Sequence, residues 1–373
     1  MKPSNNKKIA LAHDFLTVWG GAERVFQVMA DMYPEAPIYT LFYDEALAGE
    51  RFPGREIRTS FLQKFPKWLR ESNWLLPLYP VAVETLDLRN FDIVLSSSGA
   101  WMKGLVTRLY TKHVSYLHSP MRYVWDTYHE HPGLTSGFKF WKRLFMSYLR
   151  LWDKEAADRP DMLLVNSDYT QKRVAKYYRR ESQVIYPPLT LQCSPRTVVA
   201  SDARESEAHE HLEPGAHRTD ASTEAHRDTK ESAQRPFVVV ARLTASKHID
   251  VVIQAFNKLG LPLEIVGTGK AESYLRSLAG KNIVFRGALT DRELEAVYVR
   301  ARALIQPSEE DFGLVALEAL SCGVPVIAYR GGAIEEIVTP GTTGELFDDL
   351  VPESLAGTRK IGYADRKRNS TTT

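Results

Sequence analysis

The sequence predicts an α/β protein made of two doubly wound domains, each a parallel sheet covered by helices. The chain has 373 residues, more than one small core needs. Short apolar runs alternate with helical patterns, as expected for parallel strands joined by crossover helices. One long polar segment separates two regions of this kind, so we expect two domains and a linker.

The first domain is predicted over residues 1–194. Four short apolar runs read as buried strands, at residues 9–12, 92–96, 114–117 and 162–166. A Gly20-Gly21 loop follows the first run, and a helix is expected over residues 22–32.

Residues 195–235 are rich in Glu, Asp, Arg, His, Ser, Thr and Ala and hold almost no large apolar side chain. Such a segment cannot bury enough surface to offset the entropy of ordering it, so we expect a disordered linker or insert. Its histidines at 209, 211, 217 and 226 have no partner ligands at a fixed short spacing. A solvated linker is therefore favoured over a metal site.

The second domain is predicted over residues 236–373. Strands are expected at 237–241, 263–266, 283–285, 303–306 and 325–328, and helices at 249–259, 274–279, 291–301 and 314–321. This βα alternation is typical of a doubly wound sheet. Apolar periodicity ends near residue 355, so we expect a domain shortened at its C-terminus.

The composition is that of an ordinary folded protein, with 44% hydrophobic and 25% charged residues and a net charge of +2. The overall charge gives no indication of nucleic-acid binding. Cys193 and Cys322 are far apart in the sequence, so we expect neither a disulfide nor a metal site, and a reducing compartment is favoured. No run approaches the roughly 20 apolar residues of a membrane span, and the prediction is a cytoplasmic protein.

Candidate site residues follow the predicted strands, where doubly wound folds bind ligands. Gly20 and Gly21 precede a helix N-terminus, which favours an anion, although a simple tight turn explains them equally well. Arg242 and Lys247 follow the strand at 237–241, where two cations suit a diphosphate. A solvated basic loop is the alternative.

The stretch Glu309-Glu310-Asp311-Phe312-Gly313-Leu314 is the most informative, because an acidic loop leads into a predicted helix. Amides at Gly313 and Leu314 could bind a phosphate, while Glu310 and Glu318 could accept hydrogen bonds from vicinal hydroxyls. Acidic residues that merely complement the helix dipole would account for the loop but not for Glu318.

His118 follows the strand at 114–117 and could bind a sugar hydroxyl or a developing charge. A structural histidine is the alternative.

Together these residues resemble the retaining glycosyltransferases of family 4, which have the GT-B architecture. The resemblance covers roughly residues 8–190 and 236–350. It rests on the Gly20-Gly21 loop, His118 in HSP, Arg242 and Lys247 in ARLTASK, and Glu310 and Glu318 spaced as E-x7-E. The GVPVIA run and the glycines at 331, 332, 341 and 344 also match.

The resemblance implies two Rossmann-like domains with the active site in the cleft between them. Arg242 and Lys247 would neutralise the donor diphosphate with help from Gly20, Gly21 and the Gly313 and Leu314 amides. Glu318 would hold the ribose, with Ala288 and Leu289 flanking the base. Glu310 and His118 would contact the transferred sugar, and no metal or other cofactor is expected.

The segments at 13–15, 38–44, 118–126 and 309–313 resemble bacterial family members that transfer mannose from GDP-mannose, commonly onto lipid-linked acceptors in surface polysaccharide synthesis. The shortened C-terminus favours one alternative, a catalytically impaired nucleotide-sugar-binding or scaffold protein. It is also expected to lower stability or activity, because family members continue with a helix that braces the first domain. A dinucleotide enzyme is disfavoured because the G-x-G-x-x-G fingerprint is absent.

Two segments mix aromatic and basic residues, as helices at an anionic membrane surface do. They cover residues 61–80, with Lys64, Lys67 and Arg70, and 138–152, with Lys139, Lys142, Arg143 and Arg150. Peripheral membrane contact is one interpretation, and amphipathic helices packed on the core are the other.

Overall fold

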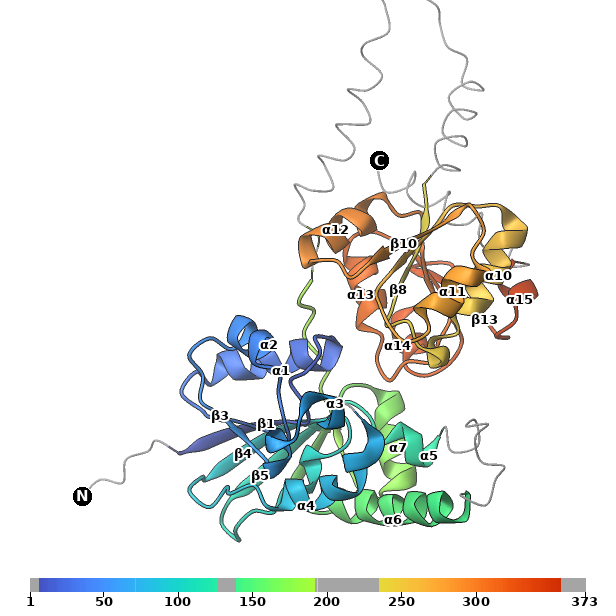
Figure 1. Cartoon of the computed structure of the whole chain (residues 1–373). Helices are drawn as coiled ribbons and strands as arrows, with labels where there is room; N and C mark the ends of the chain where they lie inside the picture. Colours follow the sequence, from blue (N-terminus) through green and yellow to red (C-terminus); the bar gives the residue numbers. More distant parts are fainter. Residues whose placement is uncertain (1–6, 71, 127–138, 192, 194–234, 357–373) are drawn as a thin grey trace, which may run out of the picture. The chain divides into compact units, whose positions relative to one another are not determined.

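The computed structural model describes residues 7–70, 72–126, 139–191, 193 and 235–356 (Figure 1). The chain forms two compact units, residues 1–188 and 189–373. Each unit has its own parallel sheet with helices on both faces, which confirms the predicted fold class. The predicted linker lies outside the described residues except for Arg235, and so does the end of the chain beyond residue 356.

Unit 1 is built on a seven-stranded parallel sheet in the order β3-β2-β1-β4-β5-β6-β7. The strands are β1 (Ile9–His13), β2 (Ile38–Thr40), β3 (Ile57–Thr59), β4 (Ile93–Ser98), β5 (Lys112–Leu117), β6 (Met162–Val165) and β7 (Gln183–Val184). The four predicted strands are all present. The three that the sequence did not reveal have only two or three residues, too few to show a periodicity. The strand order reverses at β1, so the loops after β1 and β4 leave the sheet side by side.

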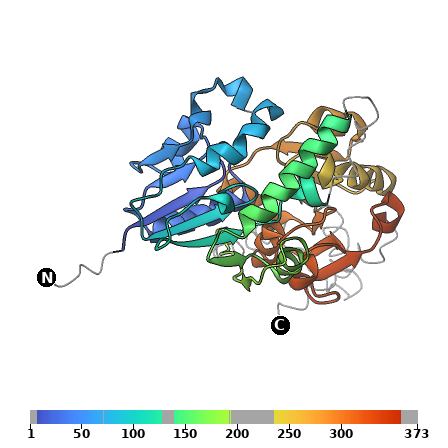
Figure 2. The ribbon, with the colours of Figure 1, turned by 90° about the horizontal axis from the view of Figure 1, so that it is seen from below.

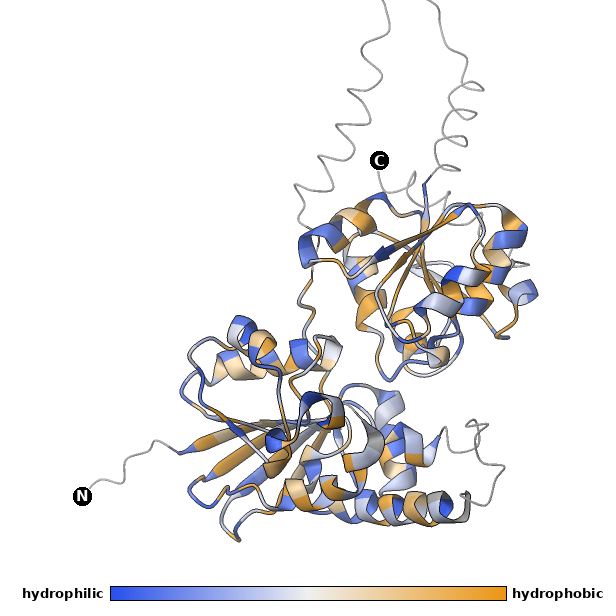
Figure 3. Ribbon diagram, viewed as in Figure 1, coloured by the Kyte–Doolittle hydropathy of each residue, from blue (hydrophilic) through white to orange (hydrophobic). Residues whose placement is uncertain are grey.

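The helices of unit 1 cover both faces of this sheet. They are α1 (Gly21–Met32), α2 (Glu45–Arg51), α3 (Lys67–Arg70), α4 (Tyr79–Glu84), α5 (Arg122–Trp125), α6 (Lys139–Ala157) and α7 (Asp168–Tyr177), with 3-10 turns η1 (Phe61–Lys64), η2 (Asn73–Leu78) and η3 (Met102–Gly104). Leu11 of β1 packs with α1 and with Phe52, which follows α2, whereas its neighbours Ala10 and Ala12 pack with α4 and α6. Figure 3 shows both sheets as mostly hydrophobic between these layers.

The expected helix over residues 61–80 is not a single helix. The segment forms η1, α3 and η2 and then enters α4. Pro66 and Pro77 lack the backbone N–H that a continuous helix needs. Ser60 and Ser72 cap η1 and η2 with their side chains, so each turn starts anew. The second expected segment is a long helix, α6, seen in full in Figure 2.

Unit 2 has a six-stranded parallel sheet in the order β10-β9-β8-β11-β12-β13. Its strands are β8 (Phe237–Val240), β9 (Leu263–Val266), β10 (Ile283–Gly287), β11 (Leu304–Gln306), β12 (Val326–Tyr329) and β13 (Gly344–Phe347). Its helices are α10 (Ile249–Leu259), α11 (Glu272–Leu278), α12 (Asp291–Arg300), α13 (Leu314–Ser321), α14 (Ile334–Ile337) and α15 (Pro352–Ala356), with the 3-10 turn η5 (Ala245–Lys247). The chain reverses direction across the sheet between β8 and β11, the topological switch point at which such sheets bind ligands.

The two cysteines form a disulfide, contrary to the sequence prediction. Cys193 is bonded to Cys322, and their Cα atoms are 4.9 Å apart. Leu191 and Cys193 pack against the hydrophobic cluster that includes residues of α12 and α13, and Cys322 directly follows α13. The 129-residue separation hid this proximity, because only folding brings the two ends of that segment together. The disulfide also removes the basis for inferring a reducing compartment.

Candidate functional site

In unit 2 the predicted donor-site residues gather at the carboxyl ends of β8 and β11. Lys247 lies in η5 after β8, and Glu310 lies in the loop after β11. Lys247 Nζ is 2.5 Å from Glu310 Oε1, and the Ser308 hydroxyl donates to the same oxygen at 2.7 Å. About a quarter of each charged side chain is exposed. The structure therefore brings the predicted phosphate-binding cation and the predicted sugar-binding carboxylate into direct contact.

Arg242 is exposed and follows β8 by two residues. A glycine-containing loop after β9 packs against the backbone on either side of it. A Cβ on Gly267 would lie 2.0 Å from the Ala241 carbonyl oxygen, and one on Gly269 would lie 2.3 Å from that of Leu243. Only glycine fits at such close approaches. In the sequence, the pattern that indicates this close approach is the Gly267-Thr268-Gly269 run directly after a buried strand. These glycines were not among the predicted site residues.

The loop that carries Glu310 is fixed by the glycine pair after β12. The Glu310 carbonyl accepts a hydrogen bond from the Ala333 amide at 2.8 Å. Gly332 has a φ of 77°, and a Cβ there would lie 2.1 Å from the Glu310 oxygen. A larger residue at 332 would push the Glu310 loop away. The position of Glu310 therefore depends on glycine at 332.

Helix α13 begins beside this loop. Gly313 is its N-cap with a φ of 104°, a conformation that favours glycine, and Leu314 is the first helical residue. The first backbone amides of a helix lack intrahelical partners and attract anions. Glu318 lies one turn further along, 5% exposed, and accepts a hydrogen bond from the Tyr298 hydroxyl at 3.2 Å. The Glu318 carboxylate is thus oriented by a residue of α12.

Ala288 and Leu289 follow β10 at the same edge of the sheet. Ala288 is exposed and Leu289 is half-buried against the cluster that contains Leu294. The Gly267 amide donates to the Gly287 carbonyl at 2.7 Å, so the loops after β9 and β10 are in contact. These two residues therefore adjoin the glycine loop that packs against the backbone around Arg242.

In unit 1 the predicted residues Gly20, Gly21 and His118 lie at the carboxyl edge of the sheet. Gly20 is the N-cap of α1, Gly21 begins the helix, and His118 directly follows β5. The half-buried His118 ring has Nε2 2.7 Å from the Ser97 hydroxyl, and its carbonyl accepts from Asn166 Nδ2 at 2.9 Å. His118 is therefore fixed through both backbone and side chain.

Asp14 is a buried acidic residue at this edge that the sequence analysis did not single out. Its carboxylate accepts hydrogen bonds from the backbone amides of residues 99, 100, 101 and 102, at 2.7–3.1 Å, and from the Ser98 hydroxyl at 3.2 Å. Four converging amides would otherwise attract an external anion. Asp14 satisfies them internally and ties the loop after β1 to the loop after β4.

Within the described parts of the chain there is no cluster of three or more His, Cys, Asp or Glu residues suited to a metal ion. The four histidines at 209, 211, 217 and 226 lie outside those parts. Across the same described ranges, no helix has the length and apolar character needed to cross a membrane.

Two family models match the chain in succession. The model described as Glycosyltransferase Family 4 matches residues 19–192, and the one described as Glycosyl transferases group 1 matches residues 222–367. The first match lies almost entirely in unit 1 and the second lies within unit 2.

Similar proteins carry corresponding names. A GDP-mannose-dependent α-(1-6)-phosphatidylinositol monomannoside mannosyltransferase of Mycolicibacterium smegmatis is 33% identical over 46% of this chain and 52% of its own length. The sulfoquinovosyl transferase SQD2 of Arabidopsis thaliana is 35% identical over 31% of this chain and 24% of its own length. The matches thus span about a quarter to a half of these relatives.

Among solved structures, HepE of Anabaena in complex with UDP and glucose superposes with a TM-score of 0.63 at 17% identity, covering 98% of this chain and 94% of that one. This likeness identifies the fold as GT-B.

Proposed function

We propose that this chain, which carries the two matched regions of a family 4 glycosyltransferase on a GT-B fold, transfers mannose from GDP-mannose to a saccharide or lipid-linked saccharide with retention at the anomeric carbon. The observation that carries the proposal is the contact between Lys247 and Glu310 beside the N-terminus of α13. A cation, a carboxylate and the first amides of a helix, which have no intrahelical partners, meet there, as suits a sugar diphosphate.

The Lys247–Glu310 pair suggests how the donor is received. A diphosphate carries more negative charge than one carboxylate, so it competes for the Lys247 ammonium and releases Glu310. Glu310 can then accept hydrogen bonds from sugar hydroxyls. Arg242 and the amides of Gly313 and Leu314 add positive potential, with Gly20 and Gly21 as further backbone contacts, so charge is balanced without a metal ion.

The remaining roles follow the family resemblance. Glu318 binds the ribose hydroxyls, since its carboxylate is already oriented by Tyr298. Ala288 and Leu289 flank the base. His118 contacts the transferred sugar and stabilises charge in the transition state. The M. smegmatis relative named as GDP-mannose-dependent supports guanine and mannose, whereas HepE was solved with UDP and glucose, so the base is the first point to test.

For the acceptor, we propose that unit 1 contacts a membrane and that this contact gives access to a lipid-linked saccharide. Large apolar side chains are exposed on two neighbouring segments that pack against the same hydrophobic cluster. Those on α3, η2 and α4 are Trp68, Trp74, Leu78 and Val81, and those on α6 are Trp141, Leu144, Tyr148 and Leu151. We call these eight residues the apolar face. Surface clusters of this kind mark interaction sites.

A thermal-shift titration with GDP, UDP, ADP, GDP-mannose and UDP-glucose, with and without EDTA, tests the donor assignment. A ligand that binds only the folded state raises its melting temperature. We expect selective, EDTA-resistant stabilisation by the guanine nucleotides. Replacing Lys247 with Ala removes a charge-assisted hydrogen bond, so binding of GDP should weaken about 30-fold.

Lys258→Ala is the matched control, because Lys258 forms an exposed ion pair with Glu353 at the end of α10. It should leave nucleotide affinity unchanged. Selective stabilisation by UDP would contradict the GDP assignment, and no stabilisation by any nucleotide would contradict a donor site in this chain. Donor binding without sugar transfer to any acceptor would instead favour a catalytically impaired binding protein.

A further inference from the structure

His118 is one member of a connected set of side chains at the carboxyl edge of the unit 1 sheet. His13 ends β1, Ser97 lies in β4, and Glu23 lies in the first turn of α1. His13 Nδ1 is 3.1 Å from both the carbonyl oxygen and the hydroxyl of Ser97, and that hydroxyl is 2.7 Å from His118 Nε2. The three strand ends thus form a chain of contacts that leads to His118.

The direction of each hydrogen bond follows from its acceptors. A carbonyl oxygen can only accept, so His13 Nδ1 carries a proton and donates it to Ser97. The same N–H points at the Ser97 hydroxyl oxygen, which therefore also accepts. The hydroxyl then directs its own proton to His118 Nε2. With Nε2 as an acceptor, neutral His118 must carry its ring proton on Nδ1.

Glu23 anchors the far end of this chain. Its carboxylate is 13% exposed and lies 3.6 Å from His13 Nε2. Burial alone raises the pKa of Glu23, but the hydrogen bond and charge of His13 outweigh burial and lower it below the ordinary value. Because Nδ1–H already faces the Ser97 carbonyl, a second proton on Nε2 would make His13 an imidazolium paired with the ionised Glu23, and in either protonation state Nδ1–H is the donor toward Ser97.

Two further contacts hold the chain in place. His13 stacks on Phe26 with ring centroids 4.8 Å apart, which fixes the plane of its ring. A Cβ on Gly20 would lie 3.1 Å from Glu23 Oε2, a tight contact that the carboxylate would have to relieve by shifting. Gly20 therefore leaves room for the Glu23 carboxylate, a reason for glycine there that does not depend on a phosphate.

We propose that His13 and Ser97 are positioning residues that hold His118 in the Nδ1–H tautomer. In that tautomer His118 presents a hydrogen-bond donor at Nδ1, the form that suits a sugar oxygen gaining negative charge. The assignment of this donor to the transferred sugar rests on the proposed function. The tautomer itself follows from unit 1 alone.

Long-range ¹H–¹⁵N NMR of histidine side chains in the ligand-free, full-length protein tests the tautomer. The native His118 signals, assigned with His118→Gln, should show the Nδ1–H form as the major species. Ser97→Ala removes the donor to Nε2, which should shift the tautomer ratio about fivefold toward Nε2–H, the value of one neutral hydrogen bond. Ser97→Thr keeps the hydroxyl and should keep the tautomer, and Glu23→Gln should keep it too, because the Ser97 carbonyl still requires a proton on His13 Nδ1.

Ser96→Ala is the matched control, because the Ser96 hydroxyl contacts His113 at 2.8 Å instead of His118. It should leave the His118 signals in place. A native His118 protonated on Nε2, or a tautomer unchanged by Ser97→Ala, would overturn the proposal.

Kinetics of sugar transfer distinguish a failure of the positioning role from a failure of the proposed glycosyltransferase function. With GDP-mannose, Ser97→Ala should lower kcat about fivefold and leave the donor KM unchanged, because the donor residues of unit 2 are untouched. A native protein that shows the Nδ1–H tautomer but transfers no sugar would contradict the proposed function and leave the positioning role standing.

Discussion

His113 is a residue whose environment was visible only in the folded chain. Its side chain in β5 is fully buried, and its ring contacts the Ser96 hydroxyl. Burial lowers the pKa of His113 from 6.5 to about 4, an effect that the nearby Asp161 carboxylate only partly opposes. The folded protein therefore keeps this imidazole neutral at pH values at which the unfolded chain binds a proton.

This shift predicts a loss of stability in mild acid. Between pH 6.5 and pH 4 the unfolded chain binds a proton at position 113 that the folded chain does not, so the free energy of unfolding falls as the pH falls. The contribution of His113 is about 3 kcal/mol across that window. Urea unfolding of unit 1 at a series of pH values measures it.

The variant His113→Gln should have a shallower pH dependence over that window than the native protein. His248→Asn controls for the loss of an imidazole elsewhere, and Asn tolerates the left-handed backbone found at that position. An equally steep dependence in His113→Gln would rule out His113 as the source.

At the residue scale, the sequence predicted that Lys247, Glu310 and His118 follow strands, and the structure places each of them there. Asp14 also follows a strand, but its partners lie 84 to 88 residues away, so its position gave no sign of its role. A single acidic residue in a loop carries no sign of the amides that it will meet. Its role depends on the pairing of β1 with β4, which only the sheet topology defines.

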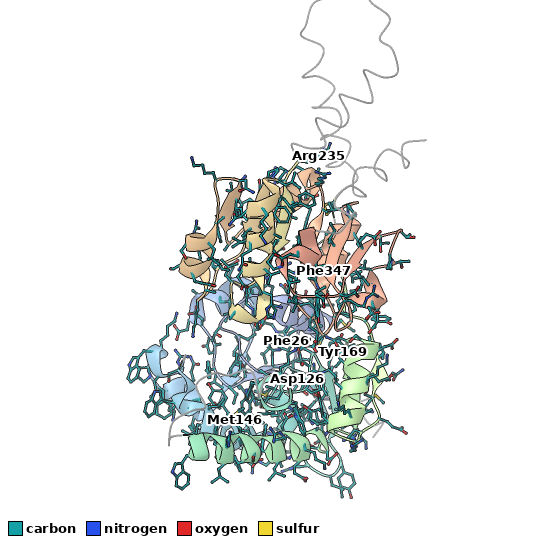
Figure 4. All side chains as sticks on the ribbon, turned by 90° about the vertical axis from the view of Figure 1, so that its right-hand side faces the viewer. Phe26, Asp126, Met146, Tyr169, Arg235 and Phe347 are labelled. Atoms are coloured by element: carbon teal, nitrogen blue, oxygen red, sulfur yellow. A yellow bond between two sulfur atoms is a disulfide. The ribbon has the colours of Figure 1, made fainter. Side chains whose placement is uncertain are left out.

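Helix α6 carries two apolar surfaces, one buried in the core and one exposed to solvent. Met146, Leu149, Trp152 and Ala156 face the core at helical spacing. In Figure 4, Met146 marks the side of α6 that faces the body of unit 1, and other side chains project from the opposite side. Trp141, Leu144, Tyr148 and Leu151 form the exposed stripe, although a solvent-facing stripe is normally polar.

Several basic residues near the apolar face already form hydrogen bonds or an ion pair within unit 1. Arg150 donates to the Val124 carbonyl, Arg70 donates to that of Tyr43, and Lys67 pairs with Asp44. Exposed Lys64 and Arg143 remain at the surface. Membrane contact should therefore depend more on apolar insertion than on charge.

Flotation with vesicles that contain anionic lipids tests this prediction. We expect the native protein to float, and Trp141→Ser combined with Leu151→Ser to reduce the bound fraction about tenfold or more, since burying each large side chain is worth roughly 1.5–3 kcal/mol. Salt should weaken binding only modestly.

Leu109→Ser combined with Tyr110→Ser is the matched control, because both residues are at least as exposed but lie in the loop before β5. It should bind like the native protein. If the native protein stays unbound, or if the control variant loses binding to the same extent, the apolar face is not a membrane-contacting surface.

At the scale of the whole molecule, the Cys193–Cys322 disulfide links the start of unit 2 to the end of α13. A crosslink over 129 residues restricts the unfolded chain strongly, and such a loop is worth about 3–5 kcal/mol. Because the two units have separate cores, the effect should be confined to unit 2.

Calorimetry with and without a thiol reductant measures this contribution. Reduction should lower the melting temperature of unit 2 by several degrees and leave the transition of unit 1 in place. The double variant Cys193→Ser, Cys322→Ser should melt like the reduced protein with or without reductant. Two free thiols in the unreduced native protein would show that the bond does not form.

The sequence by itself determined the fold class, the longer strands of both sheets and the positions, at strand ends in unit 2, of the residues that we propose for the donor site. These depend on local pattern, because buried parallel strands are short apolar runs and ligands bind where those runs end. The sequence did not show the short strands β2, β3 and β7, the edge strand β13, the broken segment at 61–80 or the disulfide.

The tertiary structure decided what depends on contacts between distant residues. It brought Lys247 to Glu310, Asp14 to the loop after β4, Cys193 to Cys322, and His13 through Ser97 to His118. Each partnership needs two strands or helices in a particular order and register. Local periodicity constrains the secondary structure of each segment, whereas packing selects which segments become neighbours, and for that reason only the folded chain revealed these pairs.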